Sequence, residues 1–164
     1  MKLYFRDNFF SAGVTEIVDE VHNPAGELNL KSAFNSAVDV YDPDGKLACK
    51  GAFRFFSSRW EVRDAREETL GVLRARMSFF RKKFTYDTEG RGSYEITSPA
   101  FSREYEVRDS HGRIVAEFQR VNGWFESGAY CLDNRSDRLG DYELVCVIMG
   151  MNNLHKSAMT AAVT

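Results

Sequence analysis

The sequence has 164 residues, of which 43% are hydrophobic, 13% aromatic and 28% charged, and its formal net charge at pH 7 is −2. This length predicts a single domain that spans residues 1–164, and the apolar content excludes an intrinsically disordered chain. Because 22 basic residues stand against 24 acidic ones, the composition predicts no binding of nucleic acid through bulk positive charge.

The ends and the cysteines of the chain indicate the compartment. Residues 1–7 become charged too early for a secretory signal, and the longest apolar run, residues 144–151, is much shorter than the ~20 residues that span a bilayer. Cys49, Cys131 and Cys146 are widely spaced and form no CxxC pair, so we expect reduced, buried thiols rather than a disulfide scaffold or a zinc site. These features predict a soluble, cytoplasmic protein with no metal and no cofactor.

Short segments between residues 37 and 118 alternate apolar and polar residues, which predicts strands with one buried face. The alternation is seen in residues 37–41, 47–55, 60–63, 73–77, 94–96, 105–107 and 114–118. In the second segment, Phe53 and Phe55 share the inward parity of Cys49. A meander of about twelve antiparallel strands leaves exposed edges unless it closes, so we predict a closed barrel.

Aspartates mark the turns between these strands. Asp42, Asp64, Asp87 and Asp109 each follow a predicted strand at nearly regular spacing. An aspartate can accept hydrogen bonds from backbone amides two residues on, and a glycine three residues later can adopt positive φ. Asp42, Asp87 and Asp109 have such a glycine, which predicts short hairpin turns. Asp64 has its next glycine only at Gly71, which predicts a longer loop.

One predicted hairpin is strongly basic. No acidic residue lies between Glu68 and Asp87, whereas five basic residues do: Arg74, Arg76, Arg81, Lys82 and Lys83. With Leu73 inward, the parity of the strand places Arg74 and Arg76 outward. With Phe84 and Tyr86 inward on the next strand, Arg81 and Lys83 also point outward. Phe79 and Phe80 lie at the tip of this hairpin.

The last apolar run, residues 144–151, has no polar residue on either parity and predicts a fully buried element. Asp141 at an N-cap position and Glu143 in the first turn favour a helix. The β-branched residues of the run favour a strand. Periodicity alone does not decide between the two.

Four stretches resemble the LURP-one-related family, which shares its fold with the tubby C-terminal domain and the phospholipid scramblases. They are Val40–Leu47, Trp60–Asp64, Tyr105–Gly112 and Tyr142–Met149. The resemblance implies a mainly β fold, in which a closed antiparallel barrel of about twelve strands encloses one C-terminal hydrophobic helix. It therefore favours a helix for residues 144–151. It implies no catalytic residue, and no lipid-binding position of the tubby domain is transferred.

Two interpretations of the basic hairpin remain open. In one, acidic neighbours such as Glu104 or Glu106 neutralise its charges, and the hairpin is an ordinary surface. In the other, Arg74, Arg76, Arg81, Lys82 and Lys83 bind anionic phospholipid headgroups, while Phe79 and Phe80 contact the membrane.

The predicted function is a non-catalytic binding or scaffold module whose partner is an anionic membrane surface or an acidic protein, and not a nucleic acid. The alternative is a small-ligand-binding or protein-interaction scaffold with no membrane role. An enzyme is the weakest candidate, because the sequence contains no GxSxG, Walker, HExxH or GxGxxG motif.

Overall fold

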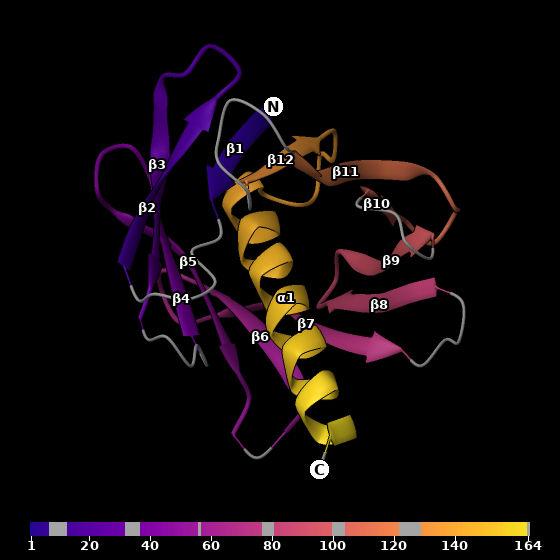
Figure 1. Ribbon diagram of the computed structural model, residues 1–164. Helices are drawn as coiled ribbons and strands as arrows, with labels where there is room; N and C mark the ends of the chain where they lie inside the picture. Colours follow the sequence, from indigo (N-terminus) through magenta and orange to yellow (C-terminus); the bar gives the residue numbers. More distant parts are fainter. Residues whose placement is uncertain are drawn as a thin grey trace.

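The structure is a computed structural model that describes residues 1–6, 13–31, 37–55, 57–76, 81–99, 104–121 and 129–163. Within these ranges the chain forms twelve strands followed by one helix (Figure 1). The elements are β1 (Lys2–Arg6), β2 (Gly13–Asp19), β3 (Pro24–Leu30), β4 (Ala37–Tyr41), β5 (Leu47–Phe53), β6 (Arg59–Asp64), β7 (Thr69–Arg76), β8 (Arg81–Thr88), β9 (Gly92–Pro99), β10 (Glu104–Arg108), β11 (Ile114–Val121), β12 (Ala129–Asn134) and α1 (Asp141–Val163).

The strands close into an antiparallel barrel, which confirms the predicted fold class. Each strand pairs with its neighbours in sequence, and β1 pairs with β12 from Lys2 opposite Asp133 to Arg6 opposite Ala129. Closure leaves every strand with two hydrogen-bonded neighbours, so the meander has no exposed edge. The inward side chains of the strands are buried, among them Leu28, Trp60 and Tyr86.

The C-terminal apolar run is helical and lies within the ring of strands (Figure 1). All residues from Leu144 to Met149 are buried, and α1 packs mainly against β4–β7. A helix that is apolar on all sides has to be surrounded by protein, and its burial outweighs the small helix-propensity cost of β-branched residues. The helix continues beyond the apolar run to Val163. Within the part of the chain that the structure describes, no helix combines the length and hydropathy needed to cross a bilayer.

The N-cap of the helix lies one residue earlier than predicted. Asp141 is its first residue, and the carbonyl of Gly140 accepts the first helical hydrogen bond, from the Leu144 amide at 3.0 Å. Gly140 is therefore the N-cap, and its own amide donates to Glu143 Oε2 at 3.2 Å. The Asp141 carboxylate instead accepts a hydrogen bond from Asn134 Nδ2 at 2.9 Å.

Four hairpin turns share one construction. They start at Asp19, Asp42, Asp64 and Asp109, and in each the Oδ1 atom of the aspartate accepts hydrogen bonds from the backbone amides two and four residues later. The residue three positions after the aspartate has positive φ in every case: His22 (65°), Gly45 (75°), Glu67 (66°) and Gly112 (77°).

This construction corrects the sequence analysis at three aspartates. The predicted longer loop after Asp64 is wrong, because Glu67 adopts the left-handed conformation that we expected only of a glycine. Asp19 starts an equivalent turn that was not predicted, since His22 stands where a glycine was expected. Asp87 was predicted to start a hairpin turn, but it lies inside β8, where its carboxylate accepts a hydrogen bond from Ser93 Oγ at 2.6 Å.

The barrel has two distinct ends. The four aspartate turns and the β8–β9 turn all connect an even-numbered strand to the next odd-numbered one, so they lie at one end, which we call the Asp-turn end. The helix also starts there, after β12. The connections from odd-numbered to even-numbered strands lie at the opposite end, which we call the far end, and α1 runs toward it.

Candidate functional site

The two ends of the barrel carry opposite charge. At the Asp-turn end, the described turns carry Asp19, Glu20, Asp42, Asp44, Asp64, Glu67, Glu68, Glu89, Asp109, Asp137 and Asp141, together with Lys46, Arg66, Arg91, Arg113, Arg135 and Arg138. At the far end, the described strand ends carry Arg6, Lys31, Arg54, Arg59, Arg76, Arg81, Lys82 and Arg120, together with Asp39 and Glu104. Within the described residues, the far end is therefore the positive pole of the barrel.

Part of this positive charge gathers on the outer side of three adjacent strands. The basic face, as we call it, consists of Arg59 on β6, Arg74 and Arg76 on β7, and Arg81 and Lys83 on β8. The inward neighbours Leu73, Phe84 and Tyr86 are buried, so Arg74, Arg76, Arg81 and Lys83 point outward as their parity predicted. Arg59 was not part of that prediction.

Two pairs of like charges face each other directly across the strands of the basic face. Arg59 is the register partner of Arg74, and Arg76 is the register partner of Lys83. Like charges directly opposite on one face of a sheet are destabilising. The fold therefore places repulsive pairs at the end of the barrel that is already positive.

Acidic residues neutralise only some of these cations. Lys83 Nζ lies 2.6 Å from Glu95 Oε2, and Arg74 Nη1 lies 3.9 Å from Asp87 Oδ2. Within the described part of the chain, neither Arg59 nor Arg76 forms an ion pair; Arg76 Nε donates to the hydroxyl of Thr85 at 3.0 Å. Exposed ion pairs of this kind contribute little stability.

The acidic partners of Lys83 and Arg74 were not among those expected. Asp87 and Glu95 contact the basic face, whereas Glu106 forms its ion pair with Arg108 at 2.6 Å. The Nε atom of Arg74 is buried and has no hydrogen-bond partner. Glu104 and Glu106 were expected without knowledge of the strand register, which brings β7 and β9 beside β8.

Lys82 is separate from the basic face. It shares the inward parity of Phe84 but lies at the rim of the far end, where its ammonium is 5.9 Å from the ring centre of Tyr105. Arg120 has the same arrangement over the ring of Tyr130, also at 5.9 Å. Both contacts are cation–π interactions. Phe79 and Phe80, the predicted membrane contacts, lie outside the described residues.

Phe55 was predicted to point inward, and the structure places it outside. Strand β5 ends at Phe53, so the alternation of buried and exposed positions stops before Phe55, whose side chain is 85% exposed. It lies in the turn between β5 and β6, at the far end. The signal that the sequence analysis missed is the Ser57-Ser58 pair, since serine is typical of turns.

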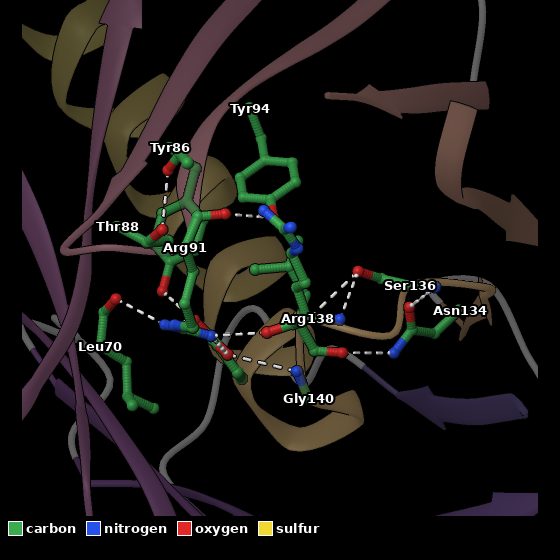
Figure 2. Close-up of polar contacts among 12 residues, drawn as sticks. Leu70, Tyr86, Thr88, Arg91, Tyr94, Asn134, Ser136, Arg138 and Gly140 are labelled. Atoms are coloured by element: carbon green, nitrogen blue, oxygen red, sulfur yellow. Dashed lines mark hydrogen bonds and ion pairs between the residues drawn. The ribbon is translucent and has the colours of Figure 1, made fainter. Parts of the chain in front are cut away.

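A partly buried polar cluster joins β8, the β8–β9 turn and the helix (Figure 2). Arg91 binds both carboxylate oxygens of Glu143 at 2.8 Å, and Tyr86 Oη donates to the same carboxylate at 2.6 Å. Arg91 also donates to the carbonyls of Leu70 at 2.6 Å and Arg138 at 2.9 Å. No pattern in the sequence predicted this cluster, because its members are far apart in the chain.

The cluster closes the Asp-turn end and holds the start of α1. The hydrogen bonds to Glu143 raise the pKa of Arg91, and burial raises the pKa of Tyr86 well above its usual value. Because the carboxylate of Glu143 is already bound by Arg91, Tyr86 and the Gly140 amide, we interpret the cluster as structural rather than as a binding site.

A pocket of about 460 Å³ lies across β1 and β8–β12. Its lining includes Tyr4, Arg81, Glu104, Gln119 and Cys131. Burial raises the pKa of the Cys131 thiol, which therefore stays protonated and unreactive at neutral pH. Among the described residues, no group of three His, Cys, Asp or Glu side chains could hold a metal ion.

Comparisons with known proteins agree with this fold. A family model described as LURP-one-related matches residues 1–148. A crystal structure of a protein from Arabidopsis thaliana is similar, with a TM-score of 0.59 and 14% sequence identity over 92% of this chain and 87% of that chain. No curated protein matches the sequence. The structural likeness concerns the fold alone, while the family match confirms the resemblance seen in the sequence.

Proposed function

The chain belongs to the LURP-one-related family, and from this membership we propose that it is a non-catalytic binding module whose far end docks on an anionic phospholipid surface. The basic face supplies the cations for the headgroups. The acidic Asp-turn end is directed away from the membrane by the same field that attracts the far end to it.

The observation that carries this proposal is the direct opposition of Arg59 to Arg74 and of Arg76 to Lys83. Such pairs reduce stability in the free protein. Anionic headgroups placed over them convert the repulsion into attraction, and each Lys or Arg near an anionic membrane contributes about 1 kcal/mol to binding. The arrangement therefore favours binding at the expense of stability.

The test is co-sedimentation with phosphatidylcholine vesicles, with and without phosphatidylserine. We expect binding only when phosphatidylserine is present and a decrease in binding as salt is added. The triple variant Arg59→Ser/Arg76→Ser/Arg81→Ser should bind roughly a hundredfold more weakly, because three contacts of about 1 kcal/mol are lost. The loss should be several hundredfold at most.

A matched control removes the same charge from the other end of the barrel. The variant Lys46→Ser/Arg66→Ser/Arg113→Ser changes three basic residues of the aspartate turns and should retain nearly all binding. Equal sedimentation of the unmodified protein with both kinds of vesicle contradicts the proposal. Equal losses in the two triple variants also contradict it, because they indicate an effect of net charge alone.

The pocket across β1 and β8–β12 favours a second candidate, a small-ligand scaffold with no membrane role. Its volume of about 460 Å³ lies within the range of ligand sites. Native mass spectrometry of the purified protein tests this candidate: a retained small molecule, combined with no vesicle binding, favours it over the first.

A further inference from the structure

The exposed side chain of Phe55 is the starting point. The large hydrophobic residues that are exposed among the described residues are Met1, Val14, Val21 and Phe55, and Phe55 is both the largest and the most exposed. Met1 and Val21 belong to the Asp-turn end, whereas Val14 and Phe55 lie at the far end, where Phe55 is the larger and the more exposed of the two. Single exposed apolar residues are common on proteins, so the surroundings of Phe55 decide its meaning.

Hydrogen bonds hold the described residues of the β5–β6 turn on either side of Phe55. The amide of Ser57 donates to the carbonyl of Arg54 at 3.0 Å, and the amide of Arg54 donates to the carbonyl of Arg59 at 2.9 Å. The amide of Arg59 donates to Ser57 Oγ at 3.0 Å. The backbone at Arg54, Ser57 and Arg59 is thus already hydrogen-bonded, and binding through Phe55 requires little further ordering of these residues.

The base of this turn is anchored in the core. Phe53, the last residue of β5, packs edge-on against the buried ring of Trp60, with ring centres 5.3 Å apart and planes at 90°. Trp60 is fully buried and follows Arg59 directly. Phe55 therefore follows, two residues on, a strand end that is packed into the core.

Two arginines flank the ring in sequence. Arg54 precedes Phe55, and Arg59 closes the turn opposite Arg74 of the basic face. An apolar aromatic side chain surrounded by cations is typical of protein segments that lie at a membrane interface. The aromatic group enters the boundary between headgroups and acyl chains, while the guanidinium groups stay with the phosphates.

We propose that Phe55 is the side chain that inserts into the bilayer when the far end docks, with Arg54 and Arg59 on the headgroup phosphates. This inference rests on the proposed function and adds to it the depth and orientation of binding. It distinguishes a lipid bilayer from a soluble polyanion, because only the bilayer offers an apolar layer to Phe55.

Site-specific labelling tests the insertion directly. The three native cysteines are free and buried, so the variant Phe55→Cys can be labelled selectively with a polarity-sensitive fluorophore. With phosphatidylserine-containing vesicles, we expect a blue shift of its emission and quenching by lipids that carry a nitroxide on the acyl chain. The control Ser110→Cys, at the Asp-turn end, should keep the emission it has in water.

A second variant separates the inference from the proposed function. Phe55→Ser should weaken binding to phosphatidylserine-containing vesicles roughly tenfold or more, since it removes a large apolar group from the interface. Its binding to heparin, a polyanion without an apolar layer, should be unchanged. The control Val21→Ser removes an exposed apolar side chain from the Asp19 turn, at the Asp-turn end, and should leave both affinities unchanged.

The outcomes are distinct. Unchanged vesicle affinity of Phe55→Ser, or a label at position 55 that keeps its aqueous emission on bound protein, overturns the inference while the role of the basic face stands. Failure of the unmodified protein to bind anionic vesicles overturns the proposed function, and the inference with it.

Discussion

The indole ring of Trp60 lies so close to Gly150 that a Cβ atom on residue 150 would be 2.3 Å from the ring Cδ1 atom. The same ring lies against Gly51 of β5, where a Cβ atom would be 2.6 Å from Cζ2. The indole Nε1–H donates to the carbonyl of Cys146 at 3.1 Å. Two glycines, one on a strand and one on the helix, thus make the space in which Trp60 joins α1 to the barrel wall.

This contact predicts the sign of the change in stability that Gly150→Ala causes. In an exposed helix, Gly→Ala stabilises by about 1 kcal/mol. At position 150 the added methyl group has to displace a fully buried indole ring, and such overpacking costs about 1–3 kcal/mol. We expect Gly150→Ala to lower the free energy of unfolding in urea titrations. A variant more stable than the unmodified protein would show that helix propensity decides at this position.

The central position of α1 predicts a larger effect at Ile148, which is 1% exposed. Ile148→Asp buries a carboxylate with no partner, at a cost of several kcal/mol against a total stability of roughly 5–15 kcal/mol. We expect loss of the cooperative melting transition followed by circular dichroism. Arg66→Ser, in an exposed turn, is the control and should change stability by about 0.5 kcal/mol at most. A soluble Ile148→Asp variant with a cooperative transition would contradict the enclosed helix.

The barrel could be predicted from the sequence because its strands have one buried face, so that apolar and polar residues alternate along each strand. The turns at Asp42 and Asp109 were equally accessible, because the aspartate and the glycine act within five residues of each other. Where another residue takes the left-handed conformation, as His22 and Glu67 do, the local signal disappears.

The candidate site was less accessible to sequence analysis. The basic hairpin was visible as a run of cations, but Arg59 joins it only through the register of β6 with β7. Phe55 was assigned inward because nothing in the alternation marks the residue at which β5 ends. The ion pair of Arg91 with Glu143 links distant segments, so only the closed barrel brings them together.

That ion pair predicts a non-additive pair of substitutions. Arg91→Ala leaves the Glu143 carboxylate, which is 4% exposed, without its cation, and breaking a buried pair in this way costs about 3–5 kcal/mol. The double variant Arg91→Ala/Glu143→Gln removes the stranded charge, so it should be more stable than Arg91→Ala alone. Urea denaturation of both single variants and the double variant measures the coupling. Additive losses would indicate that the two side chains do not act as a pair.

Buried thiol and phenol groups predict a loss of stability in alkaline solution. Burial raises the pKa of Cys49 from 9.0 to about 12, and the pKa values of Cys146 and Tyr86 lie well above their usual values. Below pH 9 the Cys49 thiol is protonated in both states, so its contribution is complete. Between pH 9 and 12 only the unfolded state ionises, and each such group lowers stability by up to about 1.4 kcal/mol per pH unit.

The measurement is the free energy of unfolding in urea as a function of pH. Its slope above pH 9 should be negative, and it should be less steep in Cys49→Ala, which removes one of the buried thiols. An identical slope in this variant would mean that Cys49 ionises equally in the folded and unfolded states.

The shared construction of the aspartate turns predicts opposite effects at equivalent positions. His22 and Gly45 both follow their aspartate by three residues and have φ of 65° and 75°. A side chain in this left-handed conformation costs about 1–2 kcal/mol, of which the greater flexibility of unfolded glycine offsets about 0.5–1 kcal/mol. We therefore expect His22→Gly to raise the free energy of unfolding by about 0.5–1 kcal/mol and Gly45→Ala to lower it by a similar amount. A Cβ atom on residue 45 would meet nothing within 4 Å, so a loss in Gly45→Ala reports the backbone conformation and not a steric clash. Thermal denaturation of the two variants decides whether φ sets the stability of these turns. The control His22→Ala keeps a Cβ atom at the strained position and should gain no stability. Equal melting temperatures for His22→Gly and His22→Ala would show that φ does not set it.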